Sequence, residues 1–236
     1  MVAVIGDVHG CYYTLQTLVD KIRSKYPLIT LYCVGDLVDR GNYSVEVIEY
    51  LTNENIQFTK GNHDMMFLAY YREPFSSMAK NWLQNGAGNT IESYESHLEK
   101  REKHLDIISA APLFIDTSDC FISHAGISIH YKKSFNEDFL VDHNRLLDLL
   151  NSDIYENHSI IWCRKELLNI GKLQVVGHTH RKETFFDSIS NTIYIDTTAF
   201  GLNKLSSAII DQNNVIEIID QVTSKNDSDS RWKYYL

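Results

Sequence analysis

The chain has 236 residues, of which 44% are hydrophobic and 22% are charged, and its formal net charge is -9. This composition is typical of a folded globular protein with a sizeable core. The negative net charge disfavours stable nucleic-acid binding, which needs a basic surface, but a metal site can still attract a small anionic substrate.

Neither a targeting nor a membrane-spanning segment is indicated. Met1–Ile5 is short and has no basic flank, so it is predicted as a strand and not as a signal peptide. No apolar stretch is long enough to cross a bilayer. We therefore expect a cytoplasmic protein with no membrane partner. The cysteines form no CxxC pair, which fits reduced thiols at Cys11, Cys33, Cys120 and Cys163.

The first 60 residues alternate between strand and helix patterns. Apolar and β-branched runs predict strands at Val2–Ile5, Leu28–Val34 and Ile56–Lys60. Helical spacing of apolar residues predicts helices at Tyr12–Tyr26 and Ser44–Leu51. This order implies a parallel sheet, in which right-handed crossovers bring the carboxyl ends of the strands together.

The middle of the chain is predicted to be mostly helical. Asp64–Arg72 has a helical pattern, and Ser76–Leu113 is expected to form helices in pieces with solvated charged faces. Two strands, Leu113–Asp116 and Cys120–Ser123, flank a turn. Two further helices are predicted, at Asn136–Leu150 and Trp162–Leu168.

The C-terminal part is predicted to be β-structure. Leu173–Val176 is a strand that leads into Gly177, and Asp211–Asn214 is a hairpin turn. The polar run Ser224–Ser230 is expected to be mobile. We predict one domain over residues 1–223 and a polar C-terminal tail at 224–236. The remaining strands, all expected to be antiparallel, are Thr192–Asp196, Leu205–Asp211 and Val215–Val222.

Five short motifs, each at the end of a predicted strand, carry side chains that bind metals. The mixture of carboxylate, amide and imidazole groups suits a pair of Mn, Fe or Zn ions better than Ca. Helix capping can explain one such motif but hardly five in this order. The motifs are GDVHG at Gly6–Gly10, GDLVDRG at Gly35–Gly41, GNHD at Gly61–Asp64, SHAG at Ser123–Gly126 and GHTH at Gly177–His180.

The spacing of these side chains suggests how they share two ions. Asp7 and His9 alternate along an extended segment, so both can face one ion. Asp36 ends the next strand and can give an oxygen to each of two ions about 3.5–4 Å apart. Later strand ends add an amide oxygen and two imidazoles, from Asn62, His124 and His178.

The order of the motifs resembles the calcineurin-like metallophosphoesterase superfamily. The DRG extension at Asp39–Gly41 resembles its phosphoprotein-phosphatase branch. GDVHGCYYTL, IIWCRKEL at Ile160–Leu167 and YIDTTA at Tyr194–Ala199 resemble bacterial and bacteriophage serine/threonine protein phosphatases. The resemblance runs from Val2 to Ile219. It implies a mixed α/β (α+β) fold, a four-layer α/β/β/α sandwich with the motifs at the C-terminal ends of the strands.

Carried over position by position, the resemblance implies two divalent metal ions, with Mn²⁺ preferred and Fe or Zn as alternatives. Asp7 and His9 would hold the first ion, and Asp36 would bridge the two. His63 would be the general acid, oriented by Asp39. The second ion would be held by Asn62, His124 and His178, with Asn62 beside the substrate phosphate, and the phosphate would be bound by Arg40 and Arg164.

Two positions depart from the pattern of this branch. The related phosphatases usually lack the second histidine of GHTH, whereas other metallophosphoesterases use it on the first metal. We expect His180 to be a ligand of the first metal, with a merely adjacent group as the alternative. Asp64 stands where the family usually has glutamate, and its equal charge predicts little change.

The resemblance implies a dinuclear-metal phosphomonoesterase. It would hydrolyse phosphoserine and phosphothreonine in proteins, with some phosphotyrosine activity, through in-line attack of a hydroxide that bridges the metals. A phosphorylated protein or a small phosphoester would be its substrate partner. One alternative is a diadenosine tetraphosphate (dinucleoside polyphosphate) hydrolase, which shares the opening motifs. Another is an inactive metal-binding scaffold, and a third is a nucleic-acid phosphoesterase, which the negative net charge disfavours.

Overall fold

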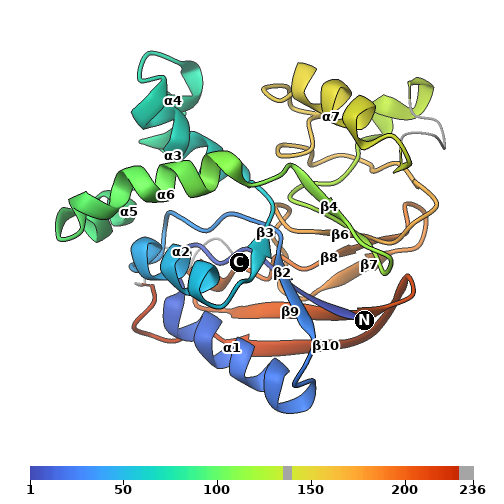
Figure 1. Ribbon diagram of the computed structural model, residues 1–236, viewed down its shortest axis with the longest axis horizontal. Coiled ribbons are helices and arrows are strands. Elements are labelled where there is room, and N and C mark those ends of the chain that lie inside the picture. Colours follow the sequence, from blue (N-terminus) through green and yellow to red (C-terminus); the bar gives the residue numbers. More distant parts are fainter. Residues whose placement is uncertain (135–139, 229–236) are drawn as a thin grey trace.

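Two mixed five-stranded sheets form the centre of the molecule (Figure 1). The computed structural model describes residues 1–134 and 140–228. The strand order is β10-β9-β1-β2-β3 in the first sheet and β4-β5-β6-β8-β7 in the second. The predicted α/β class is therefore confirmed.

The parallel part of the first sheet follows the predicted order. β1 (Val2–Ile5), β2 (Thr30–Cys33) and β3 (Gln57–Phe58) are parallel neighbours. The crossovers contain α1 (Tyr12–Lys25) and α2 (Ser44–Asn53). Because parallel strands connected in this way all end at one edge, the first three motifs come together there.

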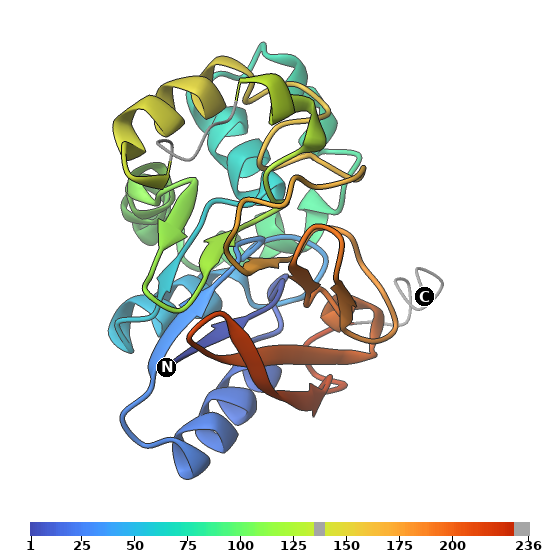
Figure 2. The same ribbon diagram turned by 90° about the vertical axis from the view of Figure 1, so that its right-hand side faces the viewer.

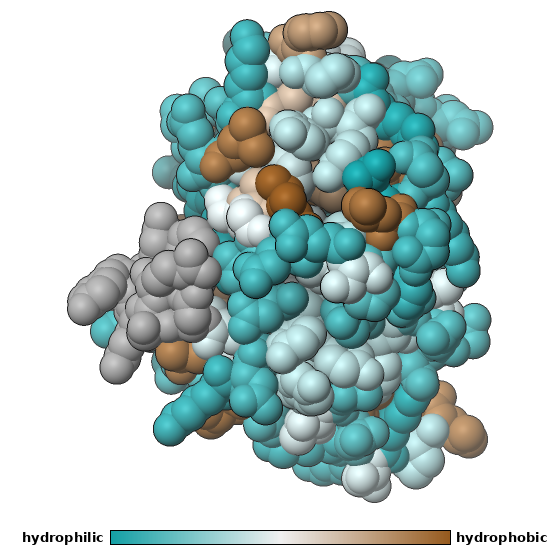
Figure 3. Space-filling view, turned by 90° about the vertical axis from the view of Figure 1, so that its left-hand side faces the viewer, coloured by the Kyte–Doolittle hydropathy of each residue, from teal (hydrophilic) through white to brown (hydrophobic). Residues whose placement is uncertain are grey.

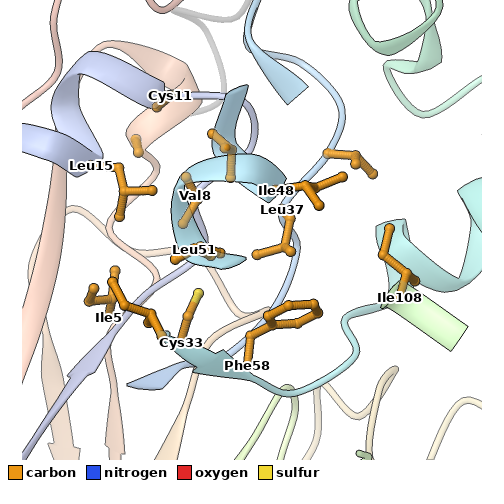
Figure 4. Close-up of a cluster of buried hydrophobic side chains, with 14 of the residues drawn as sticks. Ile5, Val8, Cys11, Leu15, Cys33, Leu37, Ile48, Leu51, Phe58 and Ile108 are labelled. Atoms are coloured by element: carbon orange, nitrogen blue, oxygen red, sulfur yellow. The ribbon is translucent and has the colours of Figure 1, made fainter. Parts of the chain in front are cut away.

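Apolar residues at helical spacing attach α1 and α2 to this sheet. Leu15 of α1 and Ile48 and Leu51 of α2 are fully buried. They belong to one core cluster with Cys33 and Phe58 of the strands, and Figure 4 shows these side chains around α2. Burial of each large aliphatic side chain contributes about 1.5–3 kcal/mol, so this face fixes the position of the motif-bearing edge.

Two long antiparallel strands complete the first sheet. β9 (Lys204–Asp211) pairs with β1, and β10 (Asn214–Val222) pairs with β9. The predicted hairpin turn between them is confirmed, with φ of 46° at Gln212 and 63° at Asn213. Positive φ at both central residues is the geometry that matches the twist of a two-residue hairpin.

The second sheet differs from the expectation in two respects. β8 is antiparallel to β7, as predicted for this strand, but it also pairs in parallel with β6 and lies in the second sheet, apart from the two C-terminal strands. β7, antiparallel to β8, was not predicted because its two phenylalanines are exposed and show no alternating pattern. The strands are β4 (Phe114–Asp116), β5 (Phe121–Ser123), β6 (Gln174–Val176), β7 (Phe185–Asp187) and β8 (Thr192–Tyr194).

The helices that follow β3 in the chain confirm the predicted helical middle. α7 (His143–Ser152) covers the later part of the helix expected at Asn136–Leu150, while residues 136–139 of that range lie outside the described residues. The other helices are α3 (Asn62–Arg72), α4 (Ser77–Trp82), α5 (Ala87–Glu95) and α6 (Leu98–Ala110).

The predicted helix at Trp162–Leu168 is wrong. The segment has a turn, a bend and irregular backbone, and Leu167 forms an isolated antiparallel bridge with Ser128. The N–H of Leu168 donates to the carbonyl of Ile127 at 2.7 Å. These bonds to a distant segment replace the bonds of a helix.

The elements stack in four layers, as the resemblance implied. A cluster that includes Val4 and Ile210 of the first sheet and Ile122 and Val175 of the second fills the space between the sheets. α1 covers the outer side of the first sheet, and α7 lies above the second (Figures 1 and 2). This arrangement directs the motif-bearing strand ends of both sheets toward one another.

The start of the predicted mobile tail is packed against the domain. Asp227 and Ser228 are buried, which contradicts the expectation of mobility at these two residues. The Asp227 carboxylate accepts hydrogen bonds from the backbone N–H groups of Tyr13 and Thr14 at 2.9 and 2.7 Å. It caps α1, whose own preceding residue, Cys11, provides no side-chain cap.

The outer surface is predominantly hydrophilic on the face shown in Figure 3, where hydrophobic residues lie scattered among polar ones. Within the described ranges, no helix combines the length and the hydrophobicity that crossing a membrane would require. The four cysteines are buried and form no disulfide.

Candidate active site

The predicted metal-binding side chains come together where strands of both sheets end. The N–H of His9 donates to the carbonyl of Asp36 at 2.8 Å, and the N–H of Gly177 donates to the carbonyl of His124 at 2.9 Å. Six of the seven predicted ligands are buried in one place, which we call the centre: Asp7, His9, Asp36, Asn62, His124 and His178.

The backbone is strained at three residues of the centre and at two residues beside it. Five predicted site residues have φ in the left-handed region, which non-glycine residues rarely adopt. Each such residue costs about 1–3 kcal/mol and persists only where its surroundings fix it, a pattern that clusters at functional sites. The residues and their φ values are His9 (44°), Asp36 (50°), Asp39 (74°), Arg40 (70°) and His178 (62°).

Two motif glycines allow the backbone to pass directly against the carboxylates. A Cβ on Gly61 would clash with Oδ1 of Asp36, and a Cβ on Gly177 would clash with Oδ1 of Asp7. The carboxylate of Asp7 also accepts a hydrogen bond from the N–H of His178 at 3.0 Å. Glycine is therefore required at both positions for the acids to keep their places.

His9 and His124 present the same ring nitrogen to Asp36. Nδ1 of His9 donates to the Val38 carbonyl at 2.8 Å, and Nδ1 of His124 donates to the Val34 carbonyl at 3.0 Å. Their Nε2 atoms lie 3.5 and 3.4 Å from Oδ2 of Asp36. Anchoring Nδ1 on a carbonyl is the usual way to orient a metal-binding histidine. One aspartate oxygen therefore lies between two imidazoles.

Two overlapping groups of the described residues bring potential ligand atoms within 4.8 Å of one another. One contains His9, Asp36 and His63, and the other contains Asp7, Asp36 and His124. Asp36 belongs to both, as a bridging carboxylate should.

His178 has the opposite orientation. Its Nε2 lies 3.2 Å from the Trp162 carbonyl, and because a carbonyl only accepts, Nε2 carries the hydrogen and Nδ1 keeps the lone pair. Burial lowers the pKa of His178 well below its usual value, and His124 and Arg164 add to this effect. The neutral ring is the form that binds metals. On the same side of the centre, Oδ1 of Asn62 lies 3.0 Å from Nε2 of His124.

The carboxylates of the centre repel one another. Burial raises the pKa of Asp7 well above its usual value, and Asp196 raises it further. Burial followed by the charge of Asp36 raises the pKa of Asp64 to about 7. Burial alone would lower the pKa of His124, but the nearby acids, Asp36 first, raise it to about 9. Bound cations relieve such repulsion, so the donor set fits two divalent ions.

His63 is oriented by a buried acid. Its Nδ1 lies 2.6 Å from Oδ2 of Asp39. Asp39 also accepts hydrogen bonds from Nε1 of Trp82 at 2.9 Å and from Oγ1 of Thr90 at 2.8 Å. Three donors therefore hold this carboxylate in place behind the imidazole.

Arg40 lies between the metal-binding residues and His63. It donates from Nη1 to Nε2 of His9 at 2.8 Å and from Nη2 to Nε2 of His63 at 2.9 Å. Arginine only donates, so both imidazoles accept at Nε2 and carry their hydrogen on Nδ1. The guanidinium also stacks 4.3 Å above the Phe200 ring.

Arg164 and His180 lie at the exposed edge of the site. Arg164 donates from Nη1 to the His178 carbonyl at 2.9 Å. His180 is exposed and belongs to neither of the two ligand groups, so its assignment to the first metal stays a prediction. Burial of part of its ring lowers the pKa of His180 although Asp196 opposes the shift.

Several supporting residues were missed by the sequence reasoning. The Asp64 carboxylate accepts from the N–H groups of Asp36 and Leu37, both at 2.9 Å, and so fixes the second motif. Asp196 follows β8 as the other acids follow their strands, a signal that could have identified it. No local motif indicates the remaining three, Trp82, Thr90 and Phe200.

Buried acids and imidazoles at the strand ends of two facing sheets, with arginines beside them, define a metal-dependent phosphoesterase. The model of one family, calcineurin-like phosphoesterase, matches residues 1–182. The chain belongs to this family, and the recognition made from its motifs is confirmed.

The chain is similar to bacterial proteins named symmetrical bis(5'-nucleosyl)-tetraphosphatase. The Neisseria meningitidis protein is 36% identical over 126 residues, which are 52% of this chain and 42% of the relative. The Buchnera aphidicola protein is 32% identical over 167 residues, 64% of this chain and 56% of the relative. The Shigella dysenteriae protein is 27% identical over 195 residues, 77% of this chain and 64% of the relative. The chain thus spans less than two thirds of each relative.

Solved structures share the fold. A protein described as a candidate diadenosine tetraphosphatase superposes with a TM-score of 0.60 at 20% identity, covering 94% of this chain and 93% of that one. A cold-active protein-tyrosine phosphatase from Shewanella gives a TM-score of 0.56 at 17% identity, covering 94% and 80%. At these identities the likeness concerns the fold alone.

Proposed function

We propose that this phosphoesterase cleaves dinucleoside tetraphosphates symmetrically and releases two nucleoside diphosphates. The names of the curated relatives support this substrate class. They favour the alternative considered from the sequence over the serine/threonine phosphatase that the motifs first suggested. The structural observation that carries the metal dependence is the pair of Nε2 atoms, from His9 and His124, within 3.5 Å of one Asp36 oxygen.

In this proposal the buried ligands divide between two ions as the sequence predicts. Asp7 and His9 would hold the first, Asp36 would contact both, and the second would be held by Asn62, His124 and Nδ1 of His178. When bound, such ions lower the pKa of water toward neutrality and offset charge on phosphoryl oxygens. The nature of the metal, Mn²⁺ or another divalent ion, depends on supply as well as on these ligands.

Arg40 changes partners during the reaction. In the structure it occupies Nε2 of His9, which a metal needs, and Nε2 of His63, from which an acid must donate. A guanidinium matches the geometry of two phosphate oxygens. We therefore propose that Arg40 turns to the substrate phosphate and frees both imidazoles. Arg164, at the edge of the centre, binds another phosphoryl oxygen.

His63 then protonates the leaving group. A water molecule loses one proton to solvent, and its oxygen bonds to one of the two inner phosphorus atoms while the bond from that phosphorus to the central bridging oxygen breaks. The bridging oxygen stays on the departing nucleoside diphosphate and takes a proton from Nε2 of His63, which solvent replaces. The carboxylate of Asp39, 2.6 Å from Nδ1, stabilises the imidazolium that donates this proton.

Purified protein should be assayed with Mn²⁺ on diadenosine tetraphosphate and on a phosphoserine peptide, with products separated by chromatography. We expect ADP as the sole nucleotide product of the first substrate. AMP together with ATP would contradict symmetrical cleavage. Turnover of the peptide alone would restore the protein-phosphatase reading, and turnover of neither substrate would favour a scaffold.

Phosphomonoester hydrolysis is the second candidate function. It is favoured by the presence of Arg40 and Arg164 at one site, as the phosphoprotein-phosphatase resemblance requires. A serine phosphate leaves as an alkoxide and needs an acid more than p-nitrophenolate does. His63→Ala should therefore reduce kcat on the phosphoserine peptide at least tenfold more than on p-nitrophenyl phosphate. Equal losses on the two esters would argue against the acid role of His63.

A further inference from the structure

An open pocket of about 560 Å³ lies directly beside the centre. Arg164 and Thr179 form the wall that the two share, since Arg164 bonds the carbonyl of His178 and Thr179 follows that histidine in the chain. The volume falls within the usual range for small-molecule sites, about 300–1,000 Å³. A substrate whose phosphates lie at the centre can therefore extend into this pocket.

The far wall of the pocket combines an arginine with two aromatic rings. The Arg181 guanidinium lies 4.5 Å from the centre of the Phe185 ring and 5.1 Å from that of Tyr194. Its backbone is fixed by a bond from its N–H to the Asp196 carbonyl at 3.0 Å. Phe185 is nevertheless 45% exposed. Exposed aromatic rings and guanidinium planes are the surfaces on which nucleobases stack.

The charges in the pocket also match a nucleotide. Arg164, Lys165 and Arg181 line it and attract phosphates, while Glu166 and Asp187 can accept hydrogen bonds from base amino groups and ribose hydroxyls. Binding of phosphate alone would not require an exposed aromatic ring.

Comparison with Phe186, the next residue on β7, shows that the exposed ring of Phe185 faces the pocket. Phe186 is 48% exposed, almost the same as Phe185, but it does not line the pocket. Successive side chains of a strand point to opposite faces, so Phe185 and Asp187 face the pocket and Phe186 faces away. The chain thus contains a matched control for the aromatic wall.

We infer that this pocket is a nucleoside subsite, in which one base of a dinucleoside tetraphosphate stacks on Phe185 and Arg181 while the tetraphosphate reaches the centre past Arg164. The inference rests on the proposed function for its choice of substrate. It adds the residues that would distinguish a nucleotide from a simple phosphate.

The test compares Phe185→Ala with Phe186→Ala on two substrates, diadenosine tetraphosphate and inorganic tripolyphosphate, which has no nucleoside. Loss of base stacking should lower kcat/KM of Phe185→Ala for the dinucleotide by about tenfold, chiefly through KM. Its activity on tripolyphosphate should stay within about twofold of the wild type, as should Phe186→Ala on both substrates. A second pair, Arg181→Gln and Lys182→Gln, repeats the comparison for charge.

Two results would overturn the subsite. One is an equal effect of the two phenylalanine variants on the dinucleotide, and the other is a loss by Phe185→Ala that is as large on tripolyphosphate. If the wild type does not cleave the dinucleotide, the proposed function fails and the subsite is tested separately. ADP should then inhibit p-nitrophenyl phosphate hydrolysis with a Ki about tenfold higher in Phe185→Ala, and an unchanged Ki would reject the subsite.

Discussion

The centre and the edge of the site are built in different ways. The centre is buried, three of its six residues have strained backbone, and its acids repel one another. The edge, which we call the rim, consists of the exposed side chains of Arg164, Arg181 and Phe185, which line a pocket, and the exposed side chain of His180. This difference suggests that the centre determines the chemistry and that the rim selects the substrate. The predictions below test that division.

The largest effect is expected at the residue shared by both ligand groups. Asp36→Asn keeps the shape of the side chain but removes the charge between the two imidazoles, so kcat/KM should fall by on the order of 10³ or more on every substrate. Asp106→Asn is the control, because that carboxylate is 77% exposed on α6. A fall in kcat/KM of less than tenfold in Asp36→Asn would contradict the role of Asp36 as the shared ligand of the centre.

Gly177→Ala tests the centre without changing a ligand. The added methyl group clashes with the Asp7 carboxylate and with a methyl of Val34, so the acid must move. Because small displacements of reacting groups cost about 10²-fold, activity should fall by roughly that factor. Gly88→Ala is the matched control, since nothing lies within 4 Å of the new Cβ. Equal activities of the two variants would contradict the tight packing inferred at Asp7.

The rim should respond more weakly and without loss of metal. Arg164→Ala removes the guanidinium that we propose binds a phosphoryl oxygen, which should lower kcat/KM roughly tenfold to a hundredfold while the metal content stays at the wild-type level. His180 is the predicted seventh ligand, on the first metal, but its ring is exposed and Asp7, His9 and Asp36 remain, so His180→Asn should weaken binding of that ion without abolishing it. Elemental analysis measures the number of metal ions per chain in both variants. Loss of one ion in His180→Asn would move that residue from the rim to the centre.

The smallest effect is expected away from the site, at the cap of α1. Asp227→Ala leaves two backbone N–H groups and the hydroxyl of Thr14 without their acceptor. The free energy of unfolding should fall by about 1–2 kcal/mol, measured by urea denaturation. Asn226→Ala, at an exposed neighbouring position, should change it by less than about 0.5 kcal/mol. Equal stabilities would show that the cap contributes nothing.

The same comparison explains what could be predicted from the sequence. The residues of the centre follow buried strands, and three of them have positive φ, so the centre leaves short local patterns such as GDVHG and GHTH. The parallel strands and their crossover helices carry the apolar spacing of a buried sheet, so the first half of the fold was also predictable.

The remaining features depend on contacts that no local pattern encodes. Residues 162–168 look helical by spacing, but Leu167 and Leu168 pair with Ser128 and Ile127 in place of helical bonds. Asp227 lies in a polar run, yet it is buried because α1 lacks a cap of its own. Phe185 lies on a short, exposed strand, so its direction toward the pocket emerges only from the pairing of β7 with β8.

The central claim is that the six buried ligands hold two metal ions. The most direct measurement is the Mn²⁺ content of the purified protein, determined by elemental analysis after chelation, titration with Mn²⁺ and removal of the free ion. The account predicts two ions per chain, with activity that returns as they bind. Saturation at one ion or none, in protein that has regained full activity, would contradict it.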